Sequence, residues 1–234
     1  MAKAKIYTPR RTDGLWRGVV ISGWIFIAMA AGLSAANVYR ALLLGEMSPT
    51  DYMVEADFIP GHEGEFWTAG LLALGLLLAY VVGAVFVLCW YLRSIRNAHV
   101  LHRGIETTPG WVVWSFFVPV VSLFRPYAMT SELWRSSRQP DGWKALRDPA
   151  ILRWWWGLLL GAGFASIGAN IFSRAAENAQ SLQQVAVVLA LVYGAQAVAG
   201  LLFLSFGGDI SRRQTELVVA GYRPPESTIP AWSA

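Results

Sequence analysis

Two histidines are the residues of this sequence best suited to holding a metal ion or a haem group. His99 and His102 are three positions apart, so a helix would place both imidazole rings on one face. Zinc needs three or four ligands, however, and a haem held between membrane helices needs histidine at membrane depth. We therefore predict no metal site and no cofactor, with haem bound through His99 or His102 as the alternative.

A second set of candidate residues follows Pro126. Proline suits the first turn of a helix, so the sequence predicts a helix from Pro126 to about Ser137. In this helix Glu132 and Arg135 lie one turn apart. Three side chains of this segment would lie against lipid headgroups or against other helices: Tyr127, Leu133 and Trp134.

A carboxylate that points inward from such a helix needs a partner. For Glu132 the guanidinium of Arg125 or Arg96 could serve, and the buried ion pair would then fix the segment to the rest of the fold. Two alternatives stay open. Glu132 could be solvated at the surface, or it could belong to a site for a ligand or a lipid headgroup.

The residue sets on which common catalytic mechanisms depend are missing. The sequence contains no Gly-rich phosphate-binding loop, no Ser, His and Asp series, and no paired carboxylates inside an apolar segment. Its single cysteine, Cys89, lies within an apolar run, which excludes an intrachain disulfide and a cysteine-based zinc site. These absences favour a protein without enzymatic activity, and an intramembrane enzyme stays open as a third hypothesis after the two binding roles given below.

The composition is that of a membrane protein. Of 234 residues, 55% are hydrophobic and 15% are charged, whereas soluble domains contain roughly 25% charged residues. The net charge of +4 does not indicate nucleic-acid binding, because the Lys and Arg residues flank apolar segments and form no basic cluster of their own. Twelve Trp residues, most of them near the ends of apolar runs, are typical of a membrane–water boundary.

Four apolar runs are long enough to cross a membrane as helices. We predict a basic cytoplasmic segment (1–17), a single helical membrane domain (18–208) and a cytoplasmic tail (209–234). For the first run a signal peptide, cleaved near Ser34, is the competing interpretation. None of the four runs contains an ionisable Asp, Glu, Lys, Arg or His, which argues against a transporter or a pump. The predicted spans are residues 18–39, 66–92, 154–173 and 185–206.

The loop after the first span contains a pattern typical of a helix start. Ser48 could cap the helix, and Pro49 could occupy its first position. A short surface helix that ends before Pro60 is therefore predicted.

The apolar stretch from Trp111 to Phe124 decides the topology of everything after it. As a helix its 14 residues would cover roughly 21 Å, against a hydrocarbon core of about 30 Å. Pro119 would also break the helix midway. If the stretch does not cross and both termini are cytoplasmic, 17 Lys and Arg residues lie inside and two outside; if it crosses, the numbers are 9 and 10. The positive-inside rule therefore favours two transmembrane hairpins joined by a re-entrant or interfacial segment, residues 111–137.

Small residues at four-residue spacing indicate how the spans could pack. The third span offers Gly157 and Gly161, followed by Ala165 and Ala169. Such a stripe lets helices approach closely, either within one chain or at a dimer seam. The side-chain amide of Gln196, in the middle of the fourth span, would find a partner in the hydroxyl of Ser22 or Ser166.

Several short motifs in the second half of the sequence resemble a family of mostly bacterial membrane proteins, the domain of unknown function 4328 family. The similarity covers roughly residues 66–213, and Ser122 stands where the family pattern has Asn. It is carried by Arg96-Asn97, Pro109-Gly110-Trp111, Phe116-Phe117-Val118-Pro119, Leu123, Pro126-Tyr127, Glu132-Leu133-Trp134 with Ser136, and the Trp cluster at Trp154.

The resemblance implies an integral membrane protein but no activity. Together with the residue patterns it predicts an all-α protein of the bacterial inner membrane, with both termini in the cytoplasm. We expect a non-catalytic accessory or scaffolding module that packs against lipid, another membrane protein or a second copy, and does not bind nucleic acid. The alternative is a binding protein for a lipid, quinone or haem, with a pocket beneath the segment from Trp111 to Glu132.

Overall fold

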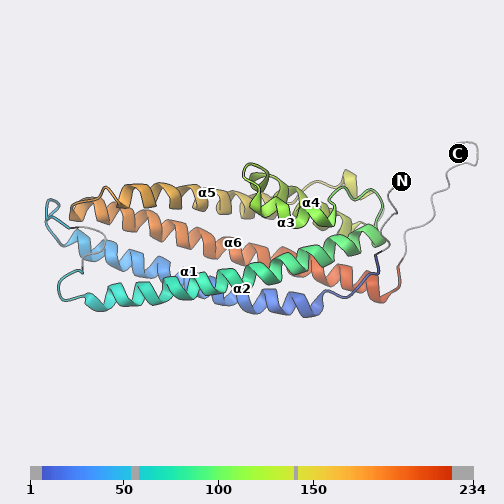
Figure 1. The fold of residues 1–234 in the computed structure, drawn as a ribbon, viewed down its shortest axis with the longest axis horizontal. Coiled ribbons are helices and arrows are strands. Elements are labelled where there is room, and N and C mark those ends of the chain that lie inside the picture. The colour runs from blue at the N-terminus through green and yellow to red at the C-terminus, as the bar shows by residue number, and fades with distance from the viewer. Residues whose placement is uncertain (1–6, 54–57, 140–141, 223–234) are drawn as a thin grey trace, which may run out of the picture. The chain divides into compact units, whose positions relative to one another are not determined.

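The computed structural model describes residues 7–53, 58–139 and 142–222, and these residues are helical or form turns and loops (Figure 1). The all-α prediction is therefore confirmed for the part of the chain described. The helices are α1 (Asp13–Gly45), α2 (Glu63–Leu101), α3 (Pro109–Phe117), α4 (Arg125–Arg138), α5 (Ala150–Ser173) and α6 (Ala179–Val219), with short 3-10 helices η1 (Val121–Leu123) and η2 (Trp143–Ala145).

Four of these helices, α1, α2, α5 and α6, are long and apolar enough to cross a membrane. This number agrees with the sequence prediction, but three of the helices extend well past the apolar runs. The predicted second span ended at residue 92, whereas α2 continues to Leu101, and α6 continues through Asp209 into the predicted tail. The extension of α2 is helical because no Gly or Pro interrupts residues 93–101 and because Ile95, Ala98 and Leu101 are buried there. The extension of α6 continues through Gly207 and Gly208 and buries Ile210 and Gln214.

The chain divides into two compact units, each described here by itself. Unit 1 comprises Met1–Arg17, Val87–Asp148 and Phe206–Ala234, and unit 2 comprises Gly18–Phe86 and Pro149–Ser205.

Within unit 2, α1 packs against both α2 and α6. Arg40 of α1 pairs with Glu65 of α2 at 2.9 Å, and both side chains are largely buried. On the other side Ser34 donates a hydrogen bond to the carbonyl of Ala190 in α6 (2.8 Å). The α5 helix packs on α6, where the Trp155 and Phe203 rings stack at 5.8 Å. Figure 1 shows these four segments running along one another.

The predicted surface helix after Ser48 is absent from the described residues. The chain instead turns at Pro49 and Thr50, and Tyr52 forms an isolated bridge with Asn178. The backbone N–H of Met53 donates to the carbonyl of Glu177 (3.1 Å), and the backbone N–H of Ala179 donates to the carbonyl of Asp51 (3.0 Å). These bonds to the α5–α6 loop replace the intrahelical ones, so the prediction was wrong for this part; residues 54–57 lie outside the described chain.

The expected pairing of Gln196 is not made. Ser22 donates back to the Gly18 carbonyl of its own helix (2.8 Å), and no hydrogen bond joins Gln196 to Ser166 among the described residues. The glycines of the α5 stripe are also unused for packing. Side-chain atoms added at Gly157 or Gly161 would meet nothing within 4 Å, so this face of α5 is open within unit 2.

Within unit 1, Trp16 packs closely against α6. A Cβ atom at Gly207 would lie 2.5 Å from the Trp16 ring. The centre of the Trp16 ring lies 5.1 Å from the centre of the Trp90 ring. The Trp90 side chain is fully buried. Glycine at position 207 therefore permits the packing of three segments of unit 1.

Gly207→Ala should destabilise the protein, because the added methyl group overlaps the Trp16 ring, which packs against the buried Trp90. Overpacking of this kind costs about 1–3 kcal/mol. Thermal unfolding in detergent, followed by tryptophan fluorescence, measures the effect.

The matched control is Gly161→Ala in α5, where the methyl group meets open space. Since alanine has the higher helix propensity, this variant should be unchanged or more stable by up to about 1 kcal/mol. Equal melting temperatures for both variants would contradict the packing described at Gly207.

Candidate functional site

The segment between α2 and α5 forms a helical hairpin in unit 1. The α3 helix ends at Phe117, two residues before Pro119, as the sequence predicted. Val120 then adopts a positive φ of 66° with ψ = −50°, a conformation that costs a β-branched residue about 1–3 kcal/mol. The chain reverses through η1 into α4, whose bounds confirm the helix predicted from Pro126 to about Ser137.

The α3 helix has one buried and one exposed face. Val112 and Ser115 are buried, whereas the three aromatic side chains of the opposite face are exposed. The exposed set continues past the end of the helix, and we call it the apolar ridge: Trp111, Trp114, Phe117, Val120 and Phe124.

The α4 helix is polar for a segment of a membrane protein, but its polar groups have partners. The buried Met129 and Leu133 contribute to the core of unit 1. Between them Thr130 lies 2.6 Å from the hydroxyl of Tyr91 and donates to the carbonyl of Pro126 (2.7 Å). This side of α4 therefore anchors the helix and leaves its opposite face for the pocket described below.

Glu132 is bonded to backbone rather than to a cation. Its carboxylate, 5% exposed, accepts the backbone N–H groups of Glu106 (2.5 Å) and Thr107 (3.1 Å). The predicted ion pair with Arg125 or Arg96 is not formed. Two amide donors already satisfy the carboxylate, so it fixes the loop that leads into α3 without needing a positive charge.

Asp148 is the second carboxylate of the site. Its two oxygens accept hydrogen bonds from the hydroxyls of Tyr127 (2.9 Å) and Ser131 (2.5 Å), which lie one turn apart on α4. The Arg135 Nε atom lies 3.4 Å away, within ion-pair distance but outside hydrogen-bond geometry. Asp148 thus ties the segment after η2 to the polar face of α4.

These residues surround a pocket of about 420 Å³ in unit 1. The α4 helix, the loop before α3 and the η2 segment each contribute side chains. Positive and negative side chains are equal in number among them. The lining residues are Glu106, Thr107, Arg125, Tyr127, Ala128, Ser131, Glu132, Arg135, Trp143, Lys144 and Asp148.

The two arginines of the pocket lie against aromatic rings. The Arg125 guanidinium lies 5.8 Å from the centre of the Trp111 ring. The Arg135 guanidinium lies at the same distance, 5.8 Å, from the centre of the Trp143 ring. No described carboxylate pairs with Arg125. Cation–π contact holds a guanidinium in place but leaves its N–H donors available.

At the rim of the pocket Lys144 pairs with Glu106 at 2.6 Å. This hydrogen bond and the nearby charges of Arg125 and Arg135 hold the pKa of Glu106 below its usual range. Both side chains are exposed, so salt screens the pair and it contributes little to stability.

Asn97 and Arg96, adjacent in α2, have different surroundings. The buried Asn97 side chain accepts the backbone N–H of Arg10 (2.9 Å) and donates to the carbonyl of the same residue (2.7 Å). This two-way pairing fixes the N-terminal segment of unit 1. Arg96 is exposed and does not line the pocket.

The two histidines do not come together with other ligands. His99 Nε2 lies 3.0 Å from the Thr107 carbonyl oxygen, and its ring faces Tyr7 at 6.1 Å. His102 is buried. Among the described residues no three His, Cys, Asp or Glu side chains form a group that could hold a metal ion.

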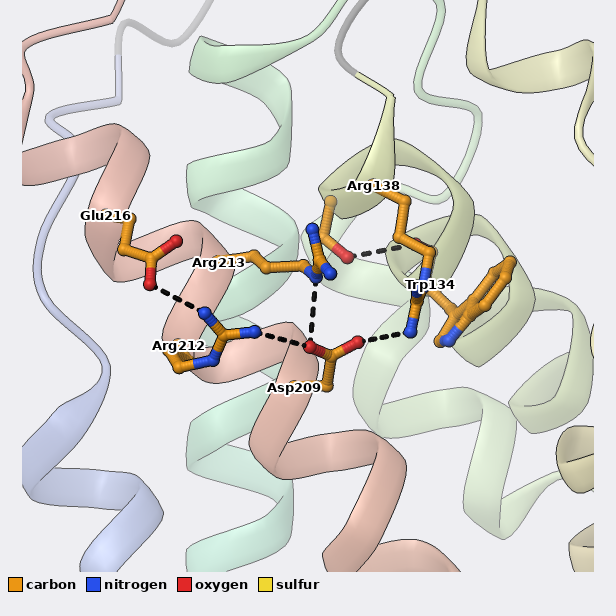
Figure 2. Close-up of polar contacts among 7 residues, drawn as sticks. Trp134, Arg138, Asp209, Arg212, Arg213 and Glu216 are labelled. Carbon is orange, nitrogen blue, oxygen red and sulfur yellow. Dashed lines mark hydrogen bonds and ion pairs between the residues drawn. The ribbon is translucent and has the colours of Figure 1, made fainter.

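A cluster of charges connects α4 to α6 (Figure 2). Asp209 accepts from Arg138 of α4 at 2.5 Å and from Arg212 and Arg213 of its own helix, both at 2.9 Å. The Arg138 guanidinium also stacks over the Trp134 ring at 4.4 Å. This cluster fixes the C-terminal end of α4 within unit 1.

Sequence reasoning missed the acidic partners of the site. The spacing of Asp209 with Arg212 and Arg213 is a recognisable helical ion-pair pattern and could have been noticed. Asp148 and Lys144 gave no such signal, because the contact of Asp148 with α4 and that of Lys144 with Glu106 depend on how the chain turns at Gly142, where φ is 73°.

Glu132→Gln should lower the free energy of unfolding by about 1–3 kcal/mol, because the new NH₂ group leaves one buried backbone N–H without an acceptor. Chemical unfolding in detergent, followed by circular dichroism, measures this change. The control is Glu216→Gln, which removes one exposed pair with Arg212 and should have little effect. If the two variants unfold alike, Glu132 does not fix the loop.

Residues 63–211 match the family described as a domain of unknown function (DUF4328). No curated protein and no solved structure matches the chain. The matched region includes α3, α4, the pocket and all of α5, and it agrees closely with the range of the resemblance noted in the sequence. With a match over more than half its length, the chain belongs to the DUF4328 family.

Proposed function

We propose that the protein is a multi-pass membrane protein that binds an anionic ligand in the pocket beside α4, without catalysing a reaction on it. The observation that supports this most is an imbalance of hydrogen-bond partners. Each carboxylate of the pocket already has donors, whereas Arg125 makes no ion pair with a described residue. A ligand that brings acceptor oxygens complements such a pocket.

The position of the arginines supports the same proposal. Arg125 and Arg135 both line the cavity, and each is held from one side by a Trp ring. Side chains fixed in this way lose little further freedom when a ligand binds. A pocket of this volume accommodates a small ligand or a headgroup.

The hydroxyls of the pocket favour binding over catalysis. Those of Tyr127 and Ser131 donate to Asp148, and no imidazole is among the lining residues. A hydroxyl nucleophile needs an adjacent base and a site for the developing negative charge. The lining residues do not supply this combination.

The charge distribution supports a cytoplasmic position for unit 1. Sixteen of the nineteen Lys and Arg residues of the chain belong to unit 1, and three belong to unit 2. By the positive-inside rule, both termini and the pocket then lie on the cytoplasmic side of a bacterial inner membrane. The α3–α4 hairpin is re-entrant or interfacial on that side, between two transmembrane hairpins.

Single-cysteine labelling tests this topology. In a Cys89→Ser background, Lys144→Cys should be protected from a membrane-impermeant maleimide in intact cells, and Glu46→Cys should react. Both positions are exposed, so access is limited by the membrane alone. Reaction of Lys144→Cys with the maleimide in intact cells would place the pocket on the outer side of the membrane and contradict the proposed topology.

A second candidate function is an accessory module that packs against another membrane protein or a second copy. The open face of α5 at Gly157 and Gly161 favours it, because small residues without intramolecular contacts allow a close helix–helix approach. Native mass spectrometry would reveal a stoichiometric protein partner or a dimer that Gly161→Leu dissociates.

Native mass spectrometry with defined probes tests the pocket. The delipidated protein is mixed with phosphatidylglycerol or with glycerol phosphate, which carries the headgroup phosphate alone. At least one probe should bind stoichiometrically, and Arg125→Gln or Arg135→Gln should weaken it about 10- to 100-fold, the value of one lost charge-assisted hydrogen bond.

Arg96→Gln is the matched control, because Arg96 is an exposed arginine of the same unit outside the pocket. It should bind the probes as the unmodified protein does. Equal binding by all three variants, or no binding of either probe, would contradict the proposed function.

A further inference from the structure

We infer that the ligand of the pocket is a phospholipid, whose phosphate binds Arg125 and Arg135 while an acyl chain lies along the apolar ridge. This inference rests on the anion-binding function proposed above. It identifies the class of ligand from a second feature of unit 1, which the pocket alone does not explain.

The second feature is the exposure of the ridge. Trp114 is 61% exposed, Phe117 66% and Phe124 67%, although all three are large apolar side chains. Trp111, Trp114 and Phe117 follow one another at three-residue spacing and give α3 an exposed apolar surface. Val120 and Phe124 continue the exposed set in the turn after the helix. In a protein with four helices that can span a membrane, acyl chains are the natural covering of such a surface.

The ridge and the pocket meet at one contact. Trp111 is the first residue of the ridge, and its ring lies under the Arg125 guanidinium that lines the pocket. At the other end of the ridge, Phe124 directly precedes Arg125 in the chain. A molecule with a charged head and an apolar tail could therefore contact both surfaces at once.

Phosphate is the head chemistry that fits best. Guanidinium groups bind phosphate oxygens through two parallel N–H donors, and two of them can share one phosphate. Tryptophan at the boundary of the pocket suits the headgroup level of a bilayer, where one side of the ring is apolar and the other is wet. A phosphate ester could also come from a soluble metabolite, and only the ridge distinguishes the two sources.

The experiment compares the two probes on a variant of the ridge. Trp114→Ser combined with Phe117→Ser removes two exposed rings that do not line the pocket. It should weaken phosphatidylglycerol binding about tenfold in native mass spectrometry and leave glycerol phosphate binding unchanged. Trp154→Ser, at an equally exposed Trp of α5, is the control and should change neither.

Three outcomes are distinguishable. Weaker binding of the lipid alone supports the inference. If glycerol phosphate binds as tightly as the lipid and the ridge variant has no effect, the ligand is soluble, so the inference fails while the proposed function stands. If neither probe depends on Arg125, both fail. Circular dichroism of the double variant, with Phe117→Ser alone as a second variant, separates lost binding from lost folding.

Discussion

The arrangement of the pocket depends on one carboxylate that is neutralised by backbone amides. Glu132 projects from α4 and accepts two N–H groups of the loop before α3. This bond places the start of α3, and with it the Trp111 ring against which Arg125 lies. Charge-assisted bonds to a buried carboxylate contribute roughly 1.5–3 kcal/mol each, enough to hold a short loop in one conformation.

The choice of backbone donors has a consequence for the arginines. Had Glu132 been neutralised by Arg125, the pocket would contain a closed ion pair with little capacity for a ligand. Because amides satisfy Glu132, and hydroxyls satisfy much of Asp148, the guanidinium groups keep donors that the described protein does not use. The polar residues of α4 thus divide into those that fix the helix and those that face the cavity.

Much of the fold follows from sequence patterns whose physics is local. Apolar runs of spanning length predicted four long helices, and Pro119 predicted the break after α3, because neither effect depends on distant residues. The ends of α2 and α6 could not be predicted in this way, since polar residues continue a helix wherever its inner face remains buried. The loop at Tyr52 escaped prediction because its partners lie in the α5–α6 connection, far away in sequence.

The same distinction applies to the site. Pro126 and Glu132 were identified as important from the sequence, but the partner of Glu132 was not, because every residue except proline carries a backbone N–H and such donors leave no sequence signal. The Asn97 pairing with the Arg10 backbone was hidden for the same reason. Acidic residues that reach the pocket from separate segments, such as Asp148, become visible only when the turns between those segments are known.

A comparison of magnitudes indicates what the ridge adds to the pocket. Two arginine–phosphate contacts contribute roughly 3–6 kcal/mol, whereas association costs about 4–15 kcal/mol of lost freedom, so a headgroup in solution binds weakly. An acyl chain laid along the ridge makes apolar contacts that a free headgroup lacks, and a tenfold gain in affinity needs only about 1.4 kcal/mol from them. The membrane also keeps headgroups concentrated beside the pocket, so a modest affinity is sufficient. On this argument the ridge adds affinity for the lipid, and the two arginines provide the selectivity for its phosphate.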